Sequence, residues 1–161
     1  MKPFLLILFV MINSGIGAQP MNNAKDDAES ILNVALPFAE ELLVKYGEYY
    51  PFAYVMKMDG KIEGVAAYNE KEKPNSQDMI NQLKKIIMTL AKENKIVASI
   101  IIYDGKITLP ESQIKKDAIF ASIDHKNDYS IVIIIPYAVE NRKIMLDNAL
   151  AQKGSSEIFV K

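Results

Sequence analysis

Two apolar runs in the second half of the chain constrain its fold more than any other feature. In residues 96–103, IVASIIIY, both sets of alternate positions are mainly apolar, and residues 129–137, YSIVIIIPY, repeat this pattern. A strand with one face in water would alternate apolar and polar side chains. These two runs are therefore predicted to be central strands of a sheet that is covered on both faces.

The first helical pattern begins at Asp26, after a polar leader over residues 19–25. Apolar residues then recur at spacings of three and four, and Gly47 is placed as a left-handed C-cap. Acidic residues at the start of this pattern suit the positive end of a helix dipole. Pro37 lies in the middle of the pattern, so we expect either a kink or two abutting helical segments.

Two further helices are predicted from the same periodicity. One follows the cap candidates Asn75 and Ser76 and carries an apolar stripe over residues 79–91. The other is expected over residues 140–152, ENRKIMLDNALAQ, and is closed by Gly154. With the first helix, these would supply cover for both faces of the sheet.

Short runs rich in β-branched and aromatic residues predict five strands, over residues 51–58, 61–68, 96–103, 117–123 and 129–137. Asp59-Gly60 separates the first two runs and predicts a two-residue hairpin turn. The sequence DGKI recurs at residues 104–107, where it is interpreted as a second use of the same turn. Residues 157–160, EIFV, are a candidate sixth strand at the C-terminus.

The predicted fold class is therefore α+β: a single antiparallel five-stranded sheet with helices on both faces, in the order α-β-β-α-β-β-β-α. This order and layering resemble the profilin-like and roadblock-type domains, a resemblance that implies a fold and no activity. In GEYYPFAYV, DGKI, DAIFASIDH and IPY the chain also resembles small exported α/β proteins of bacteria. These motifs are aromatic and turn residues, so this resemblance implies a fold family alone.

The N-terminus, MKPFLLILFVMINSGIGAQP, has the layout of a secretory signal peptide. It carries one positive charge, an apolar run, and small residues before a cleavage site after Gly17 or Ala18. The run is shorter than the roughly 20 apolar residues that a membrane span takes, so no membrane anchor is expected after cleavage. We expect removal of residues 1–18, export to the periplasm or the exterior, and a single domain over residues 26–161.

The composition excludes several chemistries. The chain has no cysteine, which rules out disulfides, thiolate metal sites and a thiol nucleophile. Its 19 basic and 20 acidic residues are interspersed, so nucleic acid is not an expected partner. The sequence contains neither a G-x-S-x-G nucleophile motif nor a glycine-rich phosphate loop. No cofactor, metal site or catalytic residue is predicted, and the balance favours a protein that is not an enzyme.

His125 is the single histidine and lies in SIDHKNDYS, between two predicted strands. Asp124 and Asp128 beside it could complete a divalent metal site, or Asp124 could orient His125 as a general base. The same residue types are common in hairpin loops, and a turn is the favoured interpretation.

The aromatic stretch KYGEYYPFAYVMKMDGK, residues 45–61, holds most of the candidate site. A two-residue turn would put the bulky residues of the first hairpin strand on one face together with Val65 and Ala67. That face is either core beneath a helix, the favoured interpretation, or an exposed patch that waits for a partner. The candidate ligand- or partner-binding residues are Tyr49, Tyr50, Phe52, Tyr54, Met56 and Tyr137.

Three functional hypotheses follow. The favoured one is an exported, non-enzymatic domain that binds another protein, as an inhibitor, immunity-type or accessory factor would. Self-association into a homodimer, through a sheet face or through the edge strand at residues 157–160, is a variant of it. The second is a sensor-like module that holds a small ligand near the tyrosines. The third is a hydrolase or metal enzyme that uses His125.

Overall fold

The computed structural model describes residues 21–67 and 73–160. The predicted signal peptide over residues 1–18 lies outside the described residues, and so do the start of the leader and residues 68–72 of the charged loop. The helices are α1 (Met21–Tyr46) and α2 (Ser76–Lys92). The strands are β1 (Phe52–Lys57), β2 (Ile62–Val65), β3 (Ile96–Thr108), β4 (Lys115–His125), β5 (Tyr129–Glu140), β6 (Lys143–Leu146) and β7 (Leu150–Lys153).

All strands in the described residues belong to one antiparallel sheet, which confirms the predicted α+β fold class, but the sheet has seven strands and not the predicted five. The strand order is β2-β1-β3-β4-β5-β6, and β7 pairs with the other half of β5. Since β2 and β3 are each antiparallel to β1, they run parallel to each other with β1 between them. A connection between parallel strands needs a crossover, and α2 provides it.

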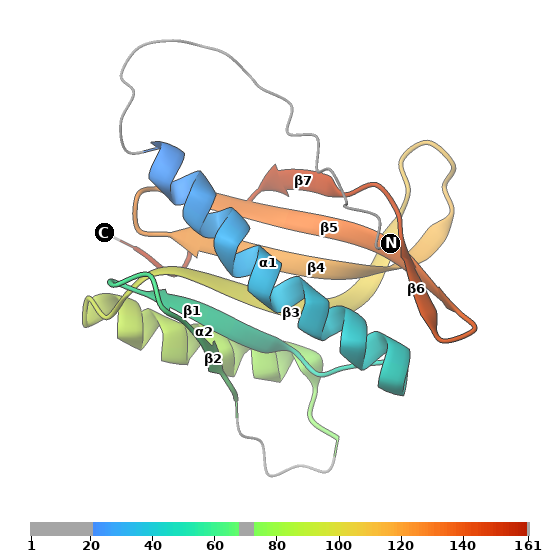
Figure 1. The fold of residues 1–161 in the computed structure, drawn as a ribbon, viewed down its shortest axis with the longest axis horizontal. Coiled ribbons are helices and arrows are strands. Elements are labelled where there is room, and N and C mark those ends of the chain that lie inside the picture. The colour runs from blue at the N-terminus through green and yellow to red at the C-terminus, as the bar shows by residue number, and fades with distance from the viewer. Residues whose placement is uncertain (1–20, 68–72, 161) are drawn as a thin grey trace.

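Both faces of the sheet are covered, as the two apolar runs predict. Figure 1 shows α1 lying diagonally across one face of the sheet, with α2 on the other side near β1 and β2. On the α1 face, buried aliphatic residues of β3, β4 and β5 pack against the apolar stripe of the helix, for example Ile100, Ile119 and Leu43. On the α2 face, Leu83 and Ile87 pack against residues of β1 and β3.

The prediction of a third helix over residues 140–152 is wrong. Residues 140–152 instead form the turn between β5 and β6, then β6 and most of β7. Asn141 and Arg142 have φ values of 50° and 59°, so both sit in the left-handed region. Two consecutive residues of this kind make a type I′ turn, which joins paired strands and ends any helix. The apolar spacing that suggests a helix here comes from two short strands in succession.

β6 and β7 both pair with β5, and the gap between them lies opposite Pro136 of β5. The carbonyl of Pro136 accepts a hydrogen bond from the Asp147 N–H, at 2.8 Å. In an antiparallel strand the N–H and C=O of one residue point toward the same neighbour, so the donor that Pro136 lacks would also point here. The interruption at residues 147–149 falls beside this missing donor. The candidate strand at residues 157–160 is also wrong, because this tail is irregular and buries Ile158 in the α2-side core.

α1 begins at Met21, so residues 21–25 of the predicted leader belong to the helix. It continues through Pro37 as one helix, which excludes two abutting segments. Pro37 and Asn33, whose carbonyl loses its usual partner, both lie on the exposed side, where solvent can satisfy that carbonyl. Gly47, with a φ of 78°, ends the helix as predicted. Within the described residues, neither helix is both long and apolar enough to cross a membrane.

The first hairpin forms as predicted, but its turn is one residue longer. Met56 pairs with Ile62, and Tyr54 pairs with Gly64, so the loop holds three residues that end at Gly60. The φ of Gly60 is 85°, which suits the left-handed position of a three-residue hairpin loop. A shift of one residue moves every β2 side chain to the other face. Val65 consequently packs on the α2 side, away from Phe52.

The second DGKI sequence is not a turn. Asp104 and Gly105 lie inside β3, opposite Ile119 and Ala118 of β4. A Cβ atom on Gly105 would come within 3.0 Å of the Phe120 ring, so a side chain at this position would crowd that ring. Because β3 continues beyond the predicted end at residue 103, Asp104 becomes part of the sheet instead of a solvated loop.

Candidate functional site

The end of the sheet where β1 starts is hollowed into a groove of about 660 Å³. Its walls come from the last turns of α1, the connection to β1, the residues after β2 and the first turn of α2. Asp104 of β3 also lines it. The lining residues are Phe38, Leu42, Tyr46, Glu48, Tyr49, Tyr50, Pro51, Phe52, Ala66, Ala67, Ser76, Met79 and Asp104. We call this feature the aromatic groove.

Phe52 is the centre of the aromatic packing in the groove. Its ring centroid lies 5.1 Å from that of Phe38 on α1 and 5.6 Å from that of Tyr49. Tyr54 packs edge-on against it at 6.1 Å and lies over Gly64 on the neighbouring strand. These contacts hold the groove wall in place, because edge-to-face aromatic pairs at such distances are favourable.

The rim of the groove carries exposed aromatic side chains. Phe38, Tyr46 and Tyr50 are 40%, 62% and 50% exposed, and they are the three aromatic members of the set of exposed large apolar residues in the described chain. All three line the aromatic groove. Exposed apolar side chains that gather at one place, and are not scattered singly, mark interaction surfaces.

α1 contributes a second apolar row that sequence reasoning missed. Val34, Phe38, Leu42 and Tyr46 follow one another at a spacing of four, beside the buried stripe of the helix. Three of these four side chains are exposed, and the last three line the groove. One apolar stripe is enough to pack a helix against a sheet, so a second apolar row predicts a further contact surface. This spacing was the signal in the sequence that could have identified Phe38.

A polar cluster lies at the Asp104 end of the groove. The hydroxyl of Tyr137 donates a hydrogen bond to Oδ1 of Asp104, at 2.9 Å. Burial raises the pKa of Asp104 above its ordinary value, nearby Asp117 adds to the rise, and the Tyr137 hydrogen bond opposes it. Burial, followed by the negative charge of Asp104, also raises the pKa of Tyr49. The Tyr49 hydroxyl is buried and has no hydrogen-bond partner in the described part of the structure.

The six predicted site residues divide into three groups. Tyr49, Tyr50 and Phe52 line the aromatic groove. Tyr137 belongs to the polar cluster at the Asp104 end of the groove, since its hydroxyl donates a hydrogen bond to Asp104. Tyr54 supports Phe52, and Met56 is buried in the α1-side core with 3% of its surface exposed. The bulky face of β1 is therefore mostly core, as favoured, and only the end near Tyr49 and Tyr50 is open.

His125 is a tether between α1 and the sheet. Its Nε2 lies 3.0 Å from Oδ2 of Asp27, and its Nδ1 accepts a hydrogen bond from the Asn127 N–H, at 3.0 Å. The imidazole side chain is 1% exposed, so both ring nitrogens are enclosed and engaged. The predicted turn follows it at residues 126–128.

Asp124 does not orient His125. It faces the opposite side of the sheet, where it accepts hydrogen bonds from the Ser130 hydroxyl and the Ile158 N–H and fixes the C-terminal tail. Within the described residues, no three His, Asp or Glu side chains gather in an arrangement that could hold a metal ion. The general-base and metal hypotheses for this loop thus lack the geometry on which they depend.

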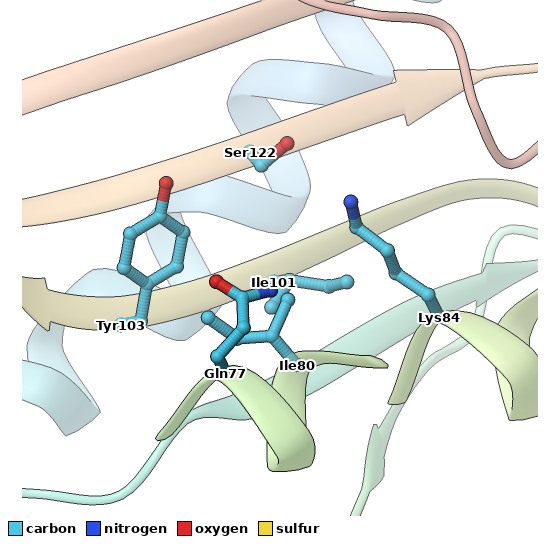
Figure 2. Close-up of a pocket in the computed structure, with 6 residues that line it drawn as sticks. All are labelled: Gln77, Ile80, Lys84, Ile101, Tyr103 and Ser122. Atoms are coloured by element: carbon cyan, nitrogen blue, oxygen red, sulfur yellow. The ribbon is translucent and has the colours of Figure 1, made fainter. Parts of the chain in front are cut away.

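A smaller cavity of about 160 Å³ lies between α2 and the sheet. Figure 2 shows Gln77, Ile80 and Lys84 of α2 on one side of this cavity and Ile101, Tyr103 and Ser122 of the sheet on the other. The Lys84 ammonium is already paired with Glu157, at 2.5 Å. This cavity therefore offers a small polar space without an unpaired charge, and the aromatic groove remains the candidate site.

Comparisons of the chain with protein-family models, with curated proteins and with solved structures found no match. The functional argument therefore depends on the groove and its chemistry alone.

Proposed function

We propose that this protein is an exported, non-enzymatic binding module whose aromatic groove takes up a segment of another protein. An inhibitor, an immunity-type protein or an accessory factor would act in this way. The observation that carries the proposal is the convergence of the three exposed aromatic side chains, Phe38, Tyr46 and Tyr50, on one groove of about 660 Å³. Export is supported by the signal-peptide pattern of residues 1–18.

The composition of the rim favours a protein partner. Tyrosine and other aromatic side chains are enriched at protein interfaces, where a few of them carry most of the binding energy. Here Phe38 and Tyr46 belong to α1, and Tyr50 lies in the connection to β1, separated from the strand by Pro51 alone. A partner segment would find these rings already in place, which lowers the entropy lost on binding.

A small ligand is the second candidate, and the size of the groove favours it. Small-molecule sites commonly measure about 300–1,000 Å³, and the groove falls in this range. Such sites also bury about 70–90% of the ligand surface. The rim residues Tyr46 and Tyr50 are 62% and 50% exposed, which describes an open groove more than an enclosed pocket.

Photo-crosslinking in the producing cells tests the proposed function. A photoreactive phenylalanine analogue replaces Tyr50 in the full chain, and the control places it at Met145 on β6, which is 49% exposed compared with 50% for Tyr50. We expect a defined crosslinked polypeptide from position 50 that is absent from position 145 and is lost when Phe38→Ala is added. Equal crosslinking from both positions, or none from position 50, would contradict a protein partner in the groove.

A further inference from the structure

Both charged residues that line the aromatic groove are acidic, and the ammonium group of Lys45 lies at its rim, over the Tyr46 ring. Glu48 and Asp104 are the only charged residues among the described residues that line it. The C-terminal end of α1, which carries the negative end of the helix dipole, also contributes to the groove through Tyr46. The N-terminal end of α2 also reaches the groove, but its positive dipole end is complemented by Asp78 in the first turn, and the Asn75 side chain caps the N–H groups of Gln77 and Asp78. The groove is thus suited to a positive charge.

Asp104 forms no salt bridge with a described residue, and the charge of Lys106 acts on it only from a longer distance. None of the ion pairs that join described residues includes it. Lys106, two residues along β3, is instead paired with Asp117 at 2.6 Å. The carboxyl group of Asp104 is only partly exposed and accepts hydrogen bonds from the Tyr137 hydroxyl and the Gly105 N–H. A partly buried carboxylate without a salt bridge is unfavourable, and a bound cation would relieve this.

The Tyr49 hydroxyl is the second unsatisfied group at the same end of the groove. Its oxygen is buried and lacks a hydrogen-bond partner within the described chain. Tyr49 lies close enough to Asp104 for that charge to raise the pKa of the phenol. Buried polar groups are normally hydrogen-bonded, and an exception calls for an explanation such as a missing ligand. A ligand with several N–H donors would satisfy Asp104 directly, and the enclosed Tyr49 hydroxyl after a movement of that side chain toward the groove.

The aromatic walls also accept cations. Nζ of Lys45 lies 5.1 Å from the ring centroid of Tyr46, so one groove ring already makes a cation–π contact. A guanidinium group combines a planar face that stacks on aromatic rings with a fork of N–H donors that matches a carboxylate. An ammonium group offers neither the plane nor the fork.

We propose that the aromatic groove binds an arginine side chain of the partner protein, with the guanidinium hydrogen-bonded to the Asp104 carboxylate and the Tyr49 hydroxyl and stacked against the aromatic walls. This inference depends on the proposed function, since it specifies the chemistry of the partner segment. Asp104 is the anchor for the charge, Tyr49 accepts one N–H of the guanidinium, and Tyr137 holds the Asp104 carboxyl in position through its own hydroxyl.

Two small probes test the inference: acetyl-Trp-Arg-amide, and acetyl-Trp-citrulline-amide, which has nearly the same shape and no charge. Because the protein contains no tryptophan, the fluorescence of the probe reports binding without background from the protein. With the protein purified from cells that express the full chain, we expect the arginine probe to bind at least tenfold more tightly than the citrulline probe. Hydrogen bonds to charged groups support a ratio of this size.

Three variants test which residues cause the difference in affinity between the arginine and citrulline probes. Asp104→Asn is expected to bring the two affinities together, whereas Glu111→Gln, which removes an exposed carboxylate between β3 and β4, is expected to keep the tenfold ratio. Tyr49→Phe is expected to weaken the arginine probe several-fold without lowering the melting temperature, since its hydroxyl makes no hydrogen bond in the free protein. A purely structural role for Tyr49 would leave the probe affinity unchanged.

The outcomes separate this inference from the proposed function. Equal affinities of the wild-type protein for the two probes overturn the arginine inference, and so does the absence of binding by either probe at millimolar concentration. If the Asp104→Asn variant still binds the arginine probe tenfold more tightly than the citrulline probe, the guanidinium binds elsewhere, and the inference is also overturned. None of these results depends on crosslinking from position 50, which decides separately whether the groove meets a protein partner.

Discussion

Asp104 and Tyr49 are the residues that the structure of the free protein leaves least satisfied. The carboxyl of Asp104 is partly buried and forms no salt bridge with a described residue, and the hydroxyl of Tyr49 is buried without a hydrogen-bond partner in the described chain. Both side chains reduce the stability of the free protein, which is the usual condition of residues kept for binding. The loss of folding stability that these two side chains cause can therefore be measured in the free protein, without any partner.

Tyr49→Phe is expected to raise the free energy of unfolding by about 1 kcal/mol. The substitution keeps the ring and its contact with Phe52, and it removes a buried hydroxyl whose desolvation costs about 1–3 kcal/mol. Urea denaturation measures this change. Tyr50→Phe serves as the control, since Tyr50 is half exposed and its hydroxyl can reach water; a Tyr49→Phe protein that is less stable than wild type would contradict an unsatisfied hydroxyl.

Asp104→Asn is expected to stabilise the free protein at pH 7. The folded state raises the pKa of Asp104 above its ordinary value of 3.8, so the folded protein holds that proton more tightly than the unfolded chain does. The stability gained from protonation is present below the ordinary pKa and is lost as the pH rises through the raised pKa. Asparagine does not ionise, so the variant escapes this loss.

Melting temperatures between pH 3 and pH 8 test this dependence. The advantage of Asp104→Asn is expected to be largest at neutral pH and to shrink as the pH falls toward 3.8. The groups that face Asp104 and titrate or carry charge are Tyr49, Tyr137, Lys106, Asp117 and Glu48. Glu111→Gln, at an exposed position between β3 and β4, is the control, and a constant difference between Asp104→Asn and wild type at all pH values would contradict the raised pKa.

At the scale of elements, the sequence predicts those parts of the fold whose signals are local. α2, with its Asn75 cap, and the Gly47 end of α1 form as predicted, because capping residues and apolar stripes act within a few residues. The first hairpin forms but slips by one residue, since Asp-Gly permits both two-residue and three-residue loops. The two loops differ in where they place the β2 side chains, and the observed three-residue loop puts Ile62 on the α1 side and Val65 on the α2 side.

The region after residue 140 could not be predicted from periodicity. Its turn, Asn141-Arg142, lacks the glycine that usually marks a type I′ turn, and its two short strands together imitate a helical spacing. Which segment lies beside β5 is decided by distant contacts, here the packing of Ile144 and Leu146 in the α1-side core. Asp104 was missed for the same reason, since the long β3 strand is fixed by its pairing with β4.

Arg142→Gly gives opposite results for the two structures of this region. In the type I′ turn observed, glycine suits the left-handed conformation, and stability is expected to rise by about 0.5–1 kcal/mol. In a helix the same substitution would lower stability by about 1 kcal/mol. Lys85→Gly on α2 is the control for that helical effect. A loss of stability for Arg142→Gly in denaturant titrations would contradict the type I′ turn and favour a helix over residues 140–152.

At the scale of the whole molecule, two unequal layers cover the sheet. α1 spans β1, β3, β4, β5 and β6, whereas α2 lies mainly on β3 and β1. Figure 1 shows this difference, with α1 crossing the sheet and α2 displaced toward the β1–β2 edge. The two helices meet the same end of the sheet at the aromatic groove, so the layering itself positions the site.

Leu83→Ala tests this layering. Leu83 is fully buried between α2 and the sheet, so its truncation is expected to lower the free energy of unfolding by about 2–5 kcal/mol. Ile86→Ala on the same helix is the matched control: Ile86 is 39% exposed, and its loss is expected to be less than about half of that for Leu83. Equal losses at the two positions would contradict the orientation of α2.

The central claim is that the aromatic groove holds a cation on Asp104, and the ionisation of that carboxyl tests it directly. Its pKa can be followed by NMR from the side-chain carboxyl carbon in the free protein and in the presence of saturating acetyl-Trp-Arg-amide. The account predicts a pKa above the ordinary value of 3.8 in the free protein and a lower pKa in the complex, because a bound guanidinium favours the ionised form. A pKa that is the same with and without bound probe would contradict the claim.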